Sequence, residues 1–358
     1  MTMISRILKR LGHFTISLVL TSLVLPLTDA QSEPFFKGKT IKIIQGRRPG
    51  GTGDLRARAI MQYLSDHIPG NPTLVSQYMP GGGGRLAANH VYQSVKPDGL
   101  TLVNIGGGFI ANAVLGARGV KYDIHKMTYL GTGNSKGSWA FYSLKELGYD
   151  SIEQMRAKEN FRIGAQNIGH DVYIQARLFA WILGLKNARF VVGYSGPEMD
   201  VALLRGEFDA RSSSIGTITT RNRDWLKKKV ITPHAVMEAP KGFRTYHPDF
   251  ADLPSLESFV DTKEEREVLK LRRIVRQVGS PYVLPPGVPA DRVKILKRAF
   301  EETYKDPRLA KTWKQWTGDD PSPILPDDQA KAVAALPKDS EVIQIFRQLA
   351  GAGPMPWR

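Results

Sequence analysis

The sequence predicts an α/β protein of two lobes, each a mostly parallel sheet flanked by helices. Two observations indicate this class: β-type runs alternate with segments of helical periodicity, and the alternation occurs in two separate parts of the chain. Length is the third observation. The chain has 358 residues, so removal of an export segment over 1–30 would leave 328, more than one compact core usually holds.

The first 30 residues have the order of a secretory signal peptide. Three basic residues precede an apolar run over 14–27, and the small residue Ala30 suits cleavage. The run is shorter than the roughly 20 residues of a membrane-spanning helix. We therefore expect cleavage after 1–30 and a periplasmic location, a permanent N-terminal anchor being the alternative.

The first lobe is expected to start as a strand, a glycine loop and a helix. Residues 40–45 are β-rich, and 54–68 carry apolar residues at helical spacing. A second strand over 73–79 and a second helix over 87–95 follow. A Pro-Asp-Gly turn then leads into a strand over 100–105.

The middle of the chain repeats this pattern. A strand over 161–165 precedes a helix over 174–182, and a strand over 189–193 precedes a helix that Pro197 opens and Gly206 closes. This is a second α/β region.

Later segments return to helical periodicity. Charged residues dominate the expected helix over 264–276, and an amphipathic helix begins near Pro289. We predict a signal peptide over 1–30, lobe 1 over 31–132, lobe 2 over 133–245, and a return to lobe 1 with C-terminal helices over 246–358.

The composition bears on possible partners. The net charge is +16, and the expected signal peptide contributes 2 of these charges, from Arg6, Lys9 and Arg10 less Asp29. Nucleic-acid binding is not favoured, because the basic residues are spread along helices such as 266–276, where a solvated face is expected. A basic field would attract small anions.

A glycine-rich loop lies between the first expected strand and helix. It contains Gly50, Gly51, Thr52, Gly53 and Asp54. Glycine allows close approach to the backbone, and the unpaired N–H groups at a helix start favour an anion. Asp54 suits the helix cap. We expect solute binding at this loop, an ordinary tight turn being the alternative.

A second glycine run, 81–84, contains a dinucleotide-type match, Gly82-x-Gly84-x-x-Ala87. The acidic residue that this motif requires should end the next strand, whereas Asp98 lies in a turn before it. A backbone-lined pocket wall or close helix packing is favoured over nucleotide binding. No cofactor is expected.

Ser135 lies in a Gly-x-Ser-x-Gly pattern typical of hydrolase nucleophile elbows. Such an elbow leads directly into a helix, but residues 139–142 are of β type. The histidines are scattered, so no partner for the serine is singled out. The sequence therefore favours a protein that is not an enzyme.

Polar residues in the middle region are candidates for the opposite wall of a cleft. Asn167, Gly169 and His170 follow one expected strand, and Tyr194 and Ser195 follow the next. Ligands of α/β sheets lie beyond the carboxyl ends of strands. For His170 alone, a helix cap or a surface position is the alternative. No metal site is expected, because the chain has 0 Cys and no paired histidine spacing.

Several motifs in fixed order carry a resemblance to a known family. They are Pro49-Gly50-Gly51-Thr52-Gly53-Asp54, Met79-Pro80-Gly81-Gly82-Gly83-Gly84, Lys96-Pro97-Asp98-Gly99-Leu100-Thr101-Leu102, Gly193-Tyr194-Ser195-Gly196-Pro197 and Leu203-Leu204-Arg205-Gly206-Glu207-Phe208-Asp209. Together they resemble the extracytoplasmic receptors of tripartite tricarboxylate transporters, also called Bug proteins, over about Lys39 to Pro326.

The resemblance implies a type II periplasmic-binding fold, whose two lobes close on a solute and deliver it to a membrane permease. It implies that the loops at 50–54 and 165–170 hold ligand carboxylates, partly through water. Gly107 and Gly108 would complete the pocket with Tyr194 and Ser195.

The sequence departs from the family pattern at Gly46, Arg47 and Arg48. Arg47 or Arg48 could bind a second carboxylate or another planar anion, a solvated loop charge being the alternative.

The resulting hypothesis is a monomeric periplasmic receptor for a small organic anion such as a dicarboxylate, without metal or cofactor. A secreted hydrolase-like enzyme and the ligand-sensing subunit of a signalling system are the alternatives.

Overall fold

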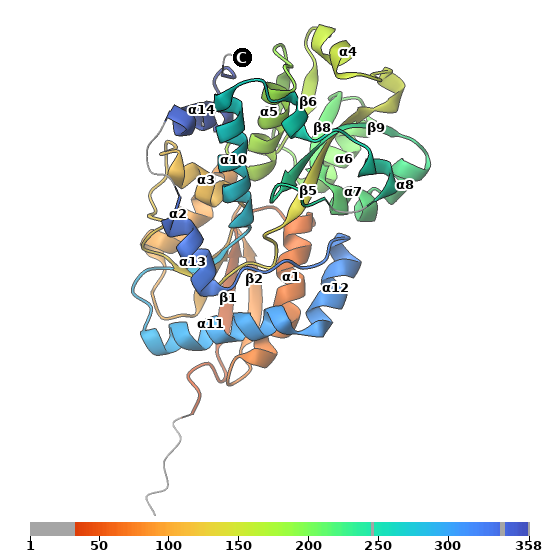
Figure 1. Ribbon diagram of the computed structural model, residues 1–358. Coiled ribbons are helices and arrows are strands. Elements are labelled where there is room, and N and C mark those ends of the chain that lie inside the picture. The colour runs from red at the N-terminus through yellow and green to blue at the C-terminus, as the bar shows by residue number, and fades with distance from the viewer. Residues whose placement is uncertain (1–32, 245–246, 337–340, 357–358) are drawn as a thin grey trace, which may run out of the picture. The chain divides into compact units, whose positions relative to one another are not determined.

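The computed structural model describes residues 33–244, 247–336 and 341–356. The predicted signal peptide lies outside these residues. From Pro34 onward the chain forms one compact unit built around two five-stranded sheets (Figure 1).

The first sheet has the strand order β2-β1-β3-β10-β4. The first three strands in the chain pair in parallel, whereas β10 is antiparallel to both of its neighbours. The strands are β1 (Thr40–Gln45), β2 (Thr73–Tyr78), β3 (Thr101–Asn104), β4 (Thr128–Tyr129) and β10 (Tyr282–Leu284).

Helices cover both faces of this sheet, because β1 alternates its apolar side chains between them. Ile41 and Ile43 pack toward α1, α11 and α12. Ile44 packs toward α2 and α3 on the other face. The helices are α1 (Thr52–Leu64), α2 (Arg85–Ser94), α3 (Gly108–Val114), α11 (Ala290–Lys305), α12 (Pro307–Thr317) and α13 (Pro326–Ala334).

The second sheet has the strand order β7-β6-β8-β5-β9. β6 pairs in parallel with β7 and β8, and β5 pairs antiparallel with β8 and β9. The strands are β5 (Gly137–Leu144), β6 (Arg162–Gly164), β7 (Arg189–Val191), β8 (Ala210–Ser214) and β9 (Ile231–Ala239).

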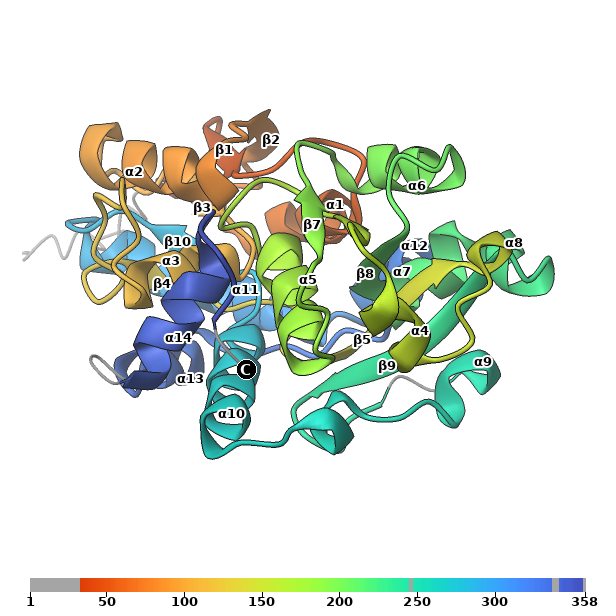
Figure 2. The same cartoon turned by 90° about the horizontal axis from the view of Figure 1, so that it is seen from above.

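The second sheet is also flanked by helices, as the view from above shows (Figure 2). α5 packs its apolar residues against one face, and α6 and α7 pack against the other. The helices of this region are α4 (Ile152–Ala157), α5 (Asp171–Ile182), α6 (Gly196–Leu204), α7 (Ile215–Arg221), α8 (Arg223–Lys227), α9 (Pro248–Ala251), α10 (Lys263–Gln277) and α14 (Glu341–Ala350).

The predicted α/β class with two helix-flanked sheets is confirmed. Each sheet is mixed, since two of its four strand pairings are antiparallel. The antiparallel partners β10 and β5 enter their sheets next to the segments that cross from one sheet to the other. A strand that follows a crossing segment is not joined to its neighbour by a helix packed on the same sheet. It can therefore pair antiparallel, because parallel pairing goes with such helical crossover connections.

The β4–β5 connection crosses between the two lobes and contacts both the α10–β10 connection, which also crosses, and the α12–α13 connection of the first lobe. Thr132 and Asn134 form bridges with Ile324 and Ser322, and the Ser280 N–H donates to the Thr132 hydroxyl at 3.2 Å. Gly279 has a φ of +73°, and a Cβ there would lie 2.5 Å from the Asn134 carbonyl oxygen. The crossing segments are therefore packed as closely as glycine permits.

The expectation of a solvated basic face along 266–276 is wrong for half of α10. Arg272, Arg273 and Arg276 are only 0%, 7% and 4% exposed. Arg272 lies 2.8 Å from the Asp171 carboxylate, and the Arg276 guanidinium stacks over Trp139 at 5.3 Å. Buried partners from distant segments thus hold these arginines inside the protein.

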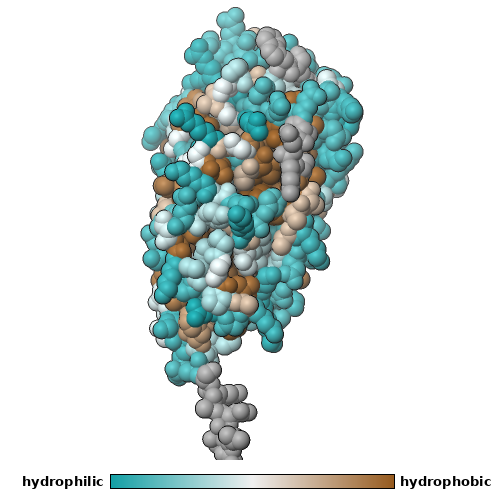
Figure 3. Space-filling model, turned by 90° about the vertical axis from the view of Figure 1, so that its left-hand side faces the viewer, coloured by the Kyte–Doolittle hydropathy of each residue, from teal (hydrophilic) through white to brown (hydrophobic). Residues whose placement is uncertain are grey.

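The face that carries α13 and α14 is mainly hydrophilic (Figure 3). Figure 3, which faces the side that carries α13 and α14, shows hydrophilic side chains separating smaller apolar patches. Within the described ranges, no helix is long and apolar enough to cross a bilayer.

Candidate anion-binding site between the lobes

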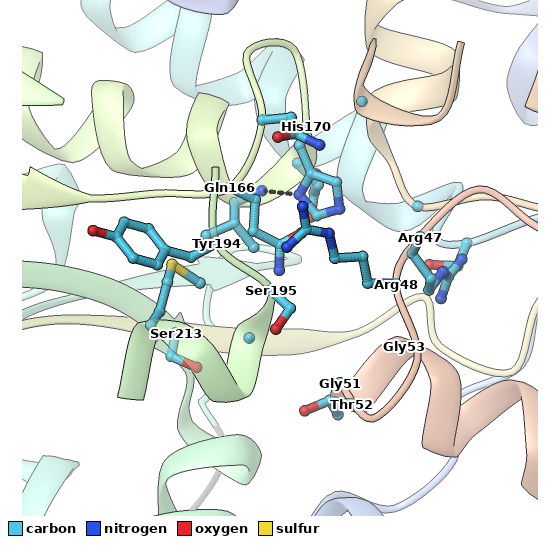
Figure 4. A pocket seen from close by; sticks show the side chains of 18 of the residues that line it. Arg47, Arg48, Gly51, Thr52, Gly53, Gln166, His170, Tyr194, Ser195 and Ser213 are labelled. Carbon is cyan, nitrogen blue, oxygen red and sulfur yellow. Dashed lines mark hydrogen bonds between the residues drawn. The ribbon is translucent and has the colours of Figure 1, made fainter. Parts of the chain in front are cut away.

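A small cavity of about 130 Å³ lies where loops from both lobes meet (Figure 4). We call it the inter-lobe cavity. Its lobe 1 wall comes from the β1–α1 loop and the glycine run before α2. Its lobe 2 wall comes from the loops that precede α5, α6 and α7. The residues that line it include Arg47, Arg48, Gly51, Thr52, Gly53, Arg56, Gly83, Trp139, Gln166, Asn167, His170, Asp171, Tyr194, Ser195, Gly196, Arg211, Ser213, Ser214, Thr217, Arg221 and Arg276.

The start of α1 presents backbone N–H groups to this cavity. Gly51 is the N-cap residue, and no side chain accepts a hydrogen bond from the first turn as a cap. The first amides of a helix have no acceptor within it, and the helix dipole makes this end positive. Such unpaired amides at a helix start favour an anion, so binding at this loop stays a prediction.

The prediction that Asp54 caps α1 is wrong. Asp54 is the third helical residue and is 1% exposed, so it does not line the cavity. Its carboxylate accepts hydrogen bonds from the Gly50 N–H at 2.9 Å, Gln45 at 3.0 Å and Tyr78 at 2.8 Å. Asp54 thus fixes the loop from behind, away from any solute.

The two loop arginines have different surroundings. Arg48 is exposed and pairs with Glu198 at 2.9 Å, on the opposite side of the cavity. Arg47 folds back over Gly53, where a Cβ would lie 2.2 Å from the Arg47 Nη1. The Arg47 Nη2 is buried without a hydrogen-bond partner. Arg47 is therefore the arginine held inside the site.

The lobe 2 wall begins with the loop before α5. His170 is the N-cap of α5, where its Nδ1 accepts a hydrogen bond from the Val172 N–H at 3.1 Å, and it also lines the cavity with Gln166 and Asn167. Capping and lining are therefore both roles of His170. The capping acceptor must be an unprotonated ring nitrogen.

A second part of this wall is the start of α6. Ser195 caps the helix by accepting from the Glu198 N–H, and Pro197 occupies its first turn. Two arginines lie beneath it: Arg211 and Arg221 share the Asp200 carboxylate, with the Arg221 Nε at 2.6 Å. This shared carboxylate leaves the α6 end of the cavity with more positive than negative charge.

The glycine run before α2 brings the two lobes into contact. Gly83 has a φ of +66°, and a Cβ there would lie 2.5 Å from the Gly169 carbonyl carbon. The Asn112 side chain donates to the Gly169 carbonyl at 3.0 Å. The glycine run 81–84 thus allows close backbone packing. This agrees with the interpretation of these glycines as packing residues, which was favoured over nucleotide binding.

The structure brings eight of the predicted site residues together around the cavity, from both lobes. They are Arg47, Gly51, Thr52, Gly53, Asn167, His170, Tyr194 and Ser195. Five others lie outside its lining: Gly50, Asp54, Gly107, Gly108 and Gly169. Gly108 and Gly169 pack against each other between the lobes, since a Cβ on Gly108 would lie 2.7 Å from the Gly169 oxygen.

Sequence reasoning missed several lining residues that are cationic or hydroxylic. They include Arg56, Arg211, Arg221 and Arg276, and the hydroxyl residues Ser213, Ser214 and Thr217. Ser214 caps α7, so the sequence Ser213-Ser214 before a helix was a usable signal. The arginines gave no local signal, because their positions depend on packing between distant elements.

Ser135 does not have the surroundings of a nucleophile. β5 follows it instead of a helix, and its hydroxyl donates to the Ser322 carbonyl at 2.7 Å. Ser135 joins the β4–β5 crossing to the α12–α13 connection, so this packing explains its position.

A larger cavity of about 820 Å³ lies on the outside of lobe 2, between α5, β7 and the C-terminal segment 351–356. Its lining is mainly apolar and aromatic, and includes Trp181 and Phe190. Arg177 lines it too but donates to the carbonyls of Gln348 and Gly353. Lys186 is the other cation of its lining and is exposed to solvent. Because the arginine is already engaged and the lysine is solvated, the inter-lobe cavity is the better candidate for an anion.

Folding stability is expected to fall as the pH is lowered from 6.5 to about 4. Burial lowers the pKa of His170 from 6.5 to about 4, and burial lowers the pKa of His234 to a similar value. The unfolded chain therefore takes up protons in this range that the folded chain does not, so the stabilisation present above pH 6.5 is progressively lost. Urea unfolding across this range should show a smaller pH dependence for His170→Gln, whereas exposed His125→Gln should match the wild type.

Comparison with known proteins supports the fold. No family model matches the sequence. A UPF0065 protein of Bordetella bronchiseptica is 32% identical over 108 residues, so the match spans 30% of this chain and 30% of that protein. The solved periplasmic binding protein BugD has a TM-score of 0.66 and 17% identity, over 87% of this chain and 98% of BugD. The chain has the fold of the Bug-type periplasmic binding proteins.

A second solved structure with this Bug-type fold contains a ligand. MatC from Rhodopseudomonas palustris, described with bound malate, has a TM-score of 0.64 and 18% identity, over 87% of this chain and 99% of MatC. The resemblance seen in the sequence is therefore confirmed at the level of the fold.

Proposed function

We propose that this chain is a periplasmic receptor that captures a small, carboxylate-bearing organic anion between its two lobes and releases it unchanged. The observation that carries the proposal is the inter-lobe cavity, where the uncapped start of α1 meets several arginine side chains. Amide groups at a helix start and guanidinium groups both bind carboxylates well.

Closure of the two lobes would trap the solute. Contacts already join the cavity walls, since the hydroxyls of Thr52 and Thr217 lie 2.7 Å apart and Arg48 pairs with Glu198. A solute that contacts both walls binds the closed form better, and it therefore shifts the population toward that form. In the proposed arrangement, the lobe built around the second sheet closes against the lobe built around the first sheet.

Other observations support transport over catalysis. The malate in MatC shows that this fold can hold a carboxylate in a related protein. The hydroxyl of Ser135 is engaged by the Ser322 carbonyl, so the hydrolase alternative has no nucleophile there. The proposal includes export to the periplasm, action as a monomer and delivery to a membrane permease; a signalling partner remains the alternative recipient.

Gly51→Phe is expected to abolish solute binding without loss of stability. Gly51 has a φ of −82°, which suits any residue, and a Cβ there meets nothing within 4 Å. A phenyl ring would therefore fill the cavity without displacing the fold. The measurement is the rise in melting temperature that carboxylates cause by mass action.

Gly137→Phe is the matched control, because a Cβ at Gly137 also meets nothing within 4 Å and this residue does not line the cavity. It should keep the full rise in melting temperature. A rise that persists in Gly51→Phe would place the solute elsewhere. Mass spectrometry of the incubated solute completes the test, since steady conversion to a product would contradict a receptor.

A further inference from the structure

We propose that Arg47 and Arg276 form a charge-selecting pair that restricts the solute to dianions, such as dicarboxylates, and disfavours monocarboxylates. This inference rests on the proposed function and concerns the same cavity. The sequence does not link these two residues, because Arg47 lies in the β1–α1 loop and Arg276 lies in α10, far apart in the chain.

Arg47 is the first member of the pair. Its guanidinium lies over Gly53 at the start of α1, where the positive end of the helix dipole already favours an anion. Its Nη2 is buried without a hydrogen-bond partner, and it forms no ion pair with any carboxylate of the described residues. Burial lowers its pKa, and the nearby carboxylates of Asp54 and Asp171 oppose this shift only in part.

Arg276 is the second member. It is 4% exposed, lines the cavity, and stacks over the Trp139 ring at 5.3 Å. Its Nε is buried without a hydrogen-bond partner, and it too forms no ion pair in the part of the chain that the structure describes. Burial lowers the pKa of Arg276 to about 10, so it stays charged at neutral pH.

The other arginines around the cavity have carboxylate partners. Arg56 pairs with Asp319 at 3.0 Å, Arg48 with Glu198 at 2.9 Å, and Arg272 with Asp171 at 2.8 Å. Arg211 and Arg221 share Asp200. Among the described residues, Arg47 and Arg276 thus differ from these neighbours because neither has a carboxylate within ion-pair distance.

Two guanidinium groups that lack an ion-pair partner can bind two negative charges of the solute. A buried charge without a partner is costly, and an anion that enters the cavity offsets that cost. A monocarboxylate can neutralise only one of the two guanidinium charges. A dianion neutralises both, and guanidinium groups can bind each carboxylate through two parallel hydrogen bonds.

The test compares matched solutes by isothermal titration calorimetry at neutral pH. Malonate, succinate, glutarate and adipate are each titrated against the monocarboxylate with the same number of carbons. For the best-bound length, the dicarboxylate should bind about 10- to 100-fold tighter than its monocarboxylate partner. Arg47→Gln and Arg276→Gln should each reduce this ratio about 10-fold or more.

Two further variants keep the result interpretable. Arg266→Gln removes an exposed arginine from the same helix and should leave the ratio unchanged. Arg276→Lys retains the charge, so it should keep part of the preference and can be read even if the glutamine variant does not fold.

Each adverse outcome has a separate meaning. Equal binding of both solute types by the wild type would overturn the charge-selecting pair while the receptor function stands. A preference that survives both glutamine substitutions would overturn the assignment to these residues. If none of the panel binds, the proposed function itself fails, and this inference fails with it.

Discussion

Gly83→Val is expected to weaken solute binding by about 10- to 100-fold, because overpacking of this size is enough to depopulate the closed form. A Cβ at this position would lie 2.5 Å from the Gly169 carbonyl carbon and 2.7 Å from the His170 nitrogen. Those atoms belong to the opposite lobe, so valine would hold the two walls of the cavity apart. A third core cluster joins residues of both lobes, but each lobe also has a cluster of its own and should remain folded.

The control for Gly83→Val must reproduce its backbone strain. Gly119 lies in the same lobe with a φ of +86°, and a Cβ there meets nothing within 4 Å. Gly119→Val should therefore share the strain but keep solute affinity. Titration calorimetry separates the two variants, and equal affinity in both would show that the lobes need not come this close to bind.

Asp171→Asn is expected to lower the free energy of unfolding by about 3–5 kcal/mol, as removal of one partner from a buried ion pair does. Arg272 is 0% exposed and lies 2.8 Å from the Asp171 carboxylate. Asparagine would leave this guanidinium buried without a counter-charge. Burial opposes ionisation of Asp171, but Arg272 and Arg276 outweigh it and lower the pKa to about 2.

Equilibrium urea unfolding of the solute-free protein measures this effect. The exposed pair of Lys145 and Asp150 provides the comparison, and Asp150→Asn should change stability by less than about 1 kcal/mol. In the wild type, the contribution of Asp171 is present above the ordinary carboxyl pKa of 3.8 and is lost as the pH falls through 2. A loss in Asp171→Asn no larger than in Asp150→Asn would mean that the pair contributes nothing net.

Much of the fold could be predicted from the sequence because its signals are local. β1 is a short β-rich run, Gly46 to Gly51 form a loop, and α1 follows with apolar side chains at helical spacing. The same holds for β6 and α5, whose junction at His170 was expected from the chain pattern. Since the carboxyl ends of such strands meet at one edge of a sheet, the loops of the cavity could be foreseen.

The charges of the site could not be foreseen, because they depend on long-range packing. The segment 266–276 has the composition of an exposed helix, yet Trp139 and Asp171 draw Arg276 and Arg272 inside. Asp54 has the residue type of a cap, but Gly51 is the N-cap and Gln45 and Tyr78 are close enough to bond the carboxylate. In both cases a partner outside the local segment decides the position of the side chain.

The place of β10 in the first sheet has a consequence for the order of folding. β10 lies between β3 and β4, although the whole of the second sheet separates it from them in the chain. During synthesis, β1 to β4 emerge early, but β3 and β4 lack the strand that lies between them until Tyr282 has been made. The strands of the second sheet, by contrast, follow one another in the chain. Pairings between distant segments form slowly. The lobe that is translated first is therefore completed last.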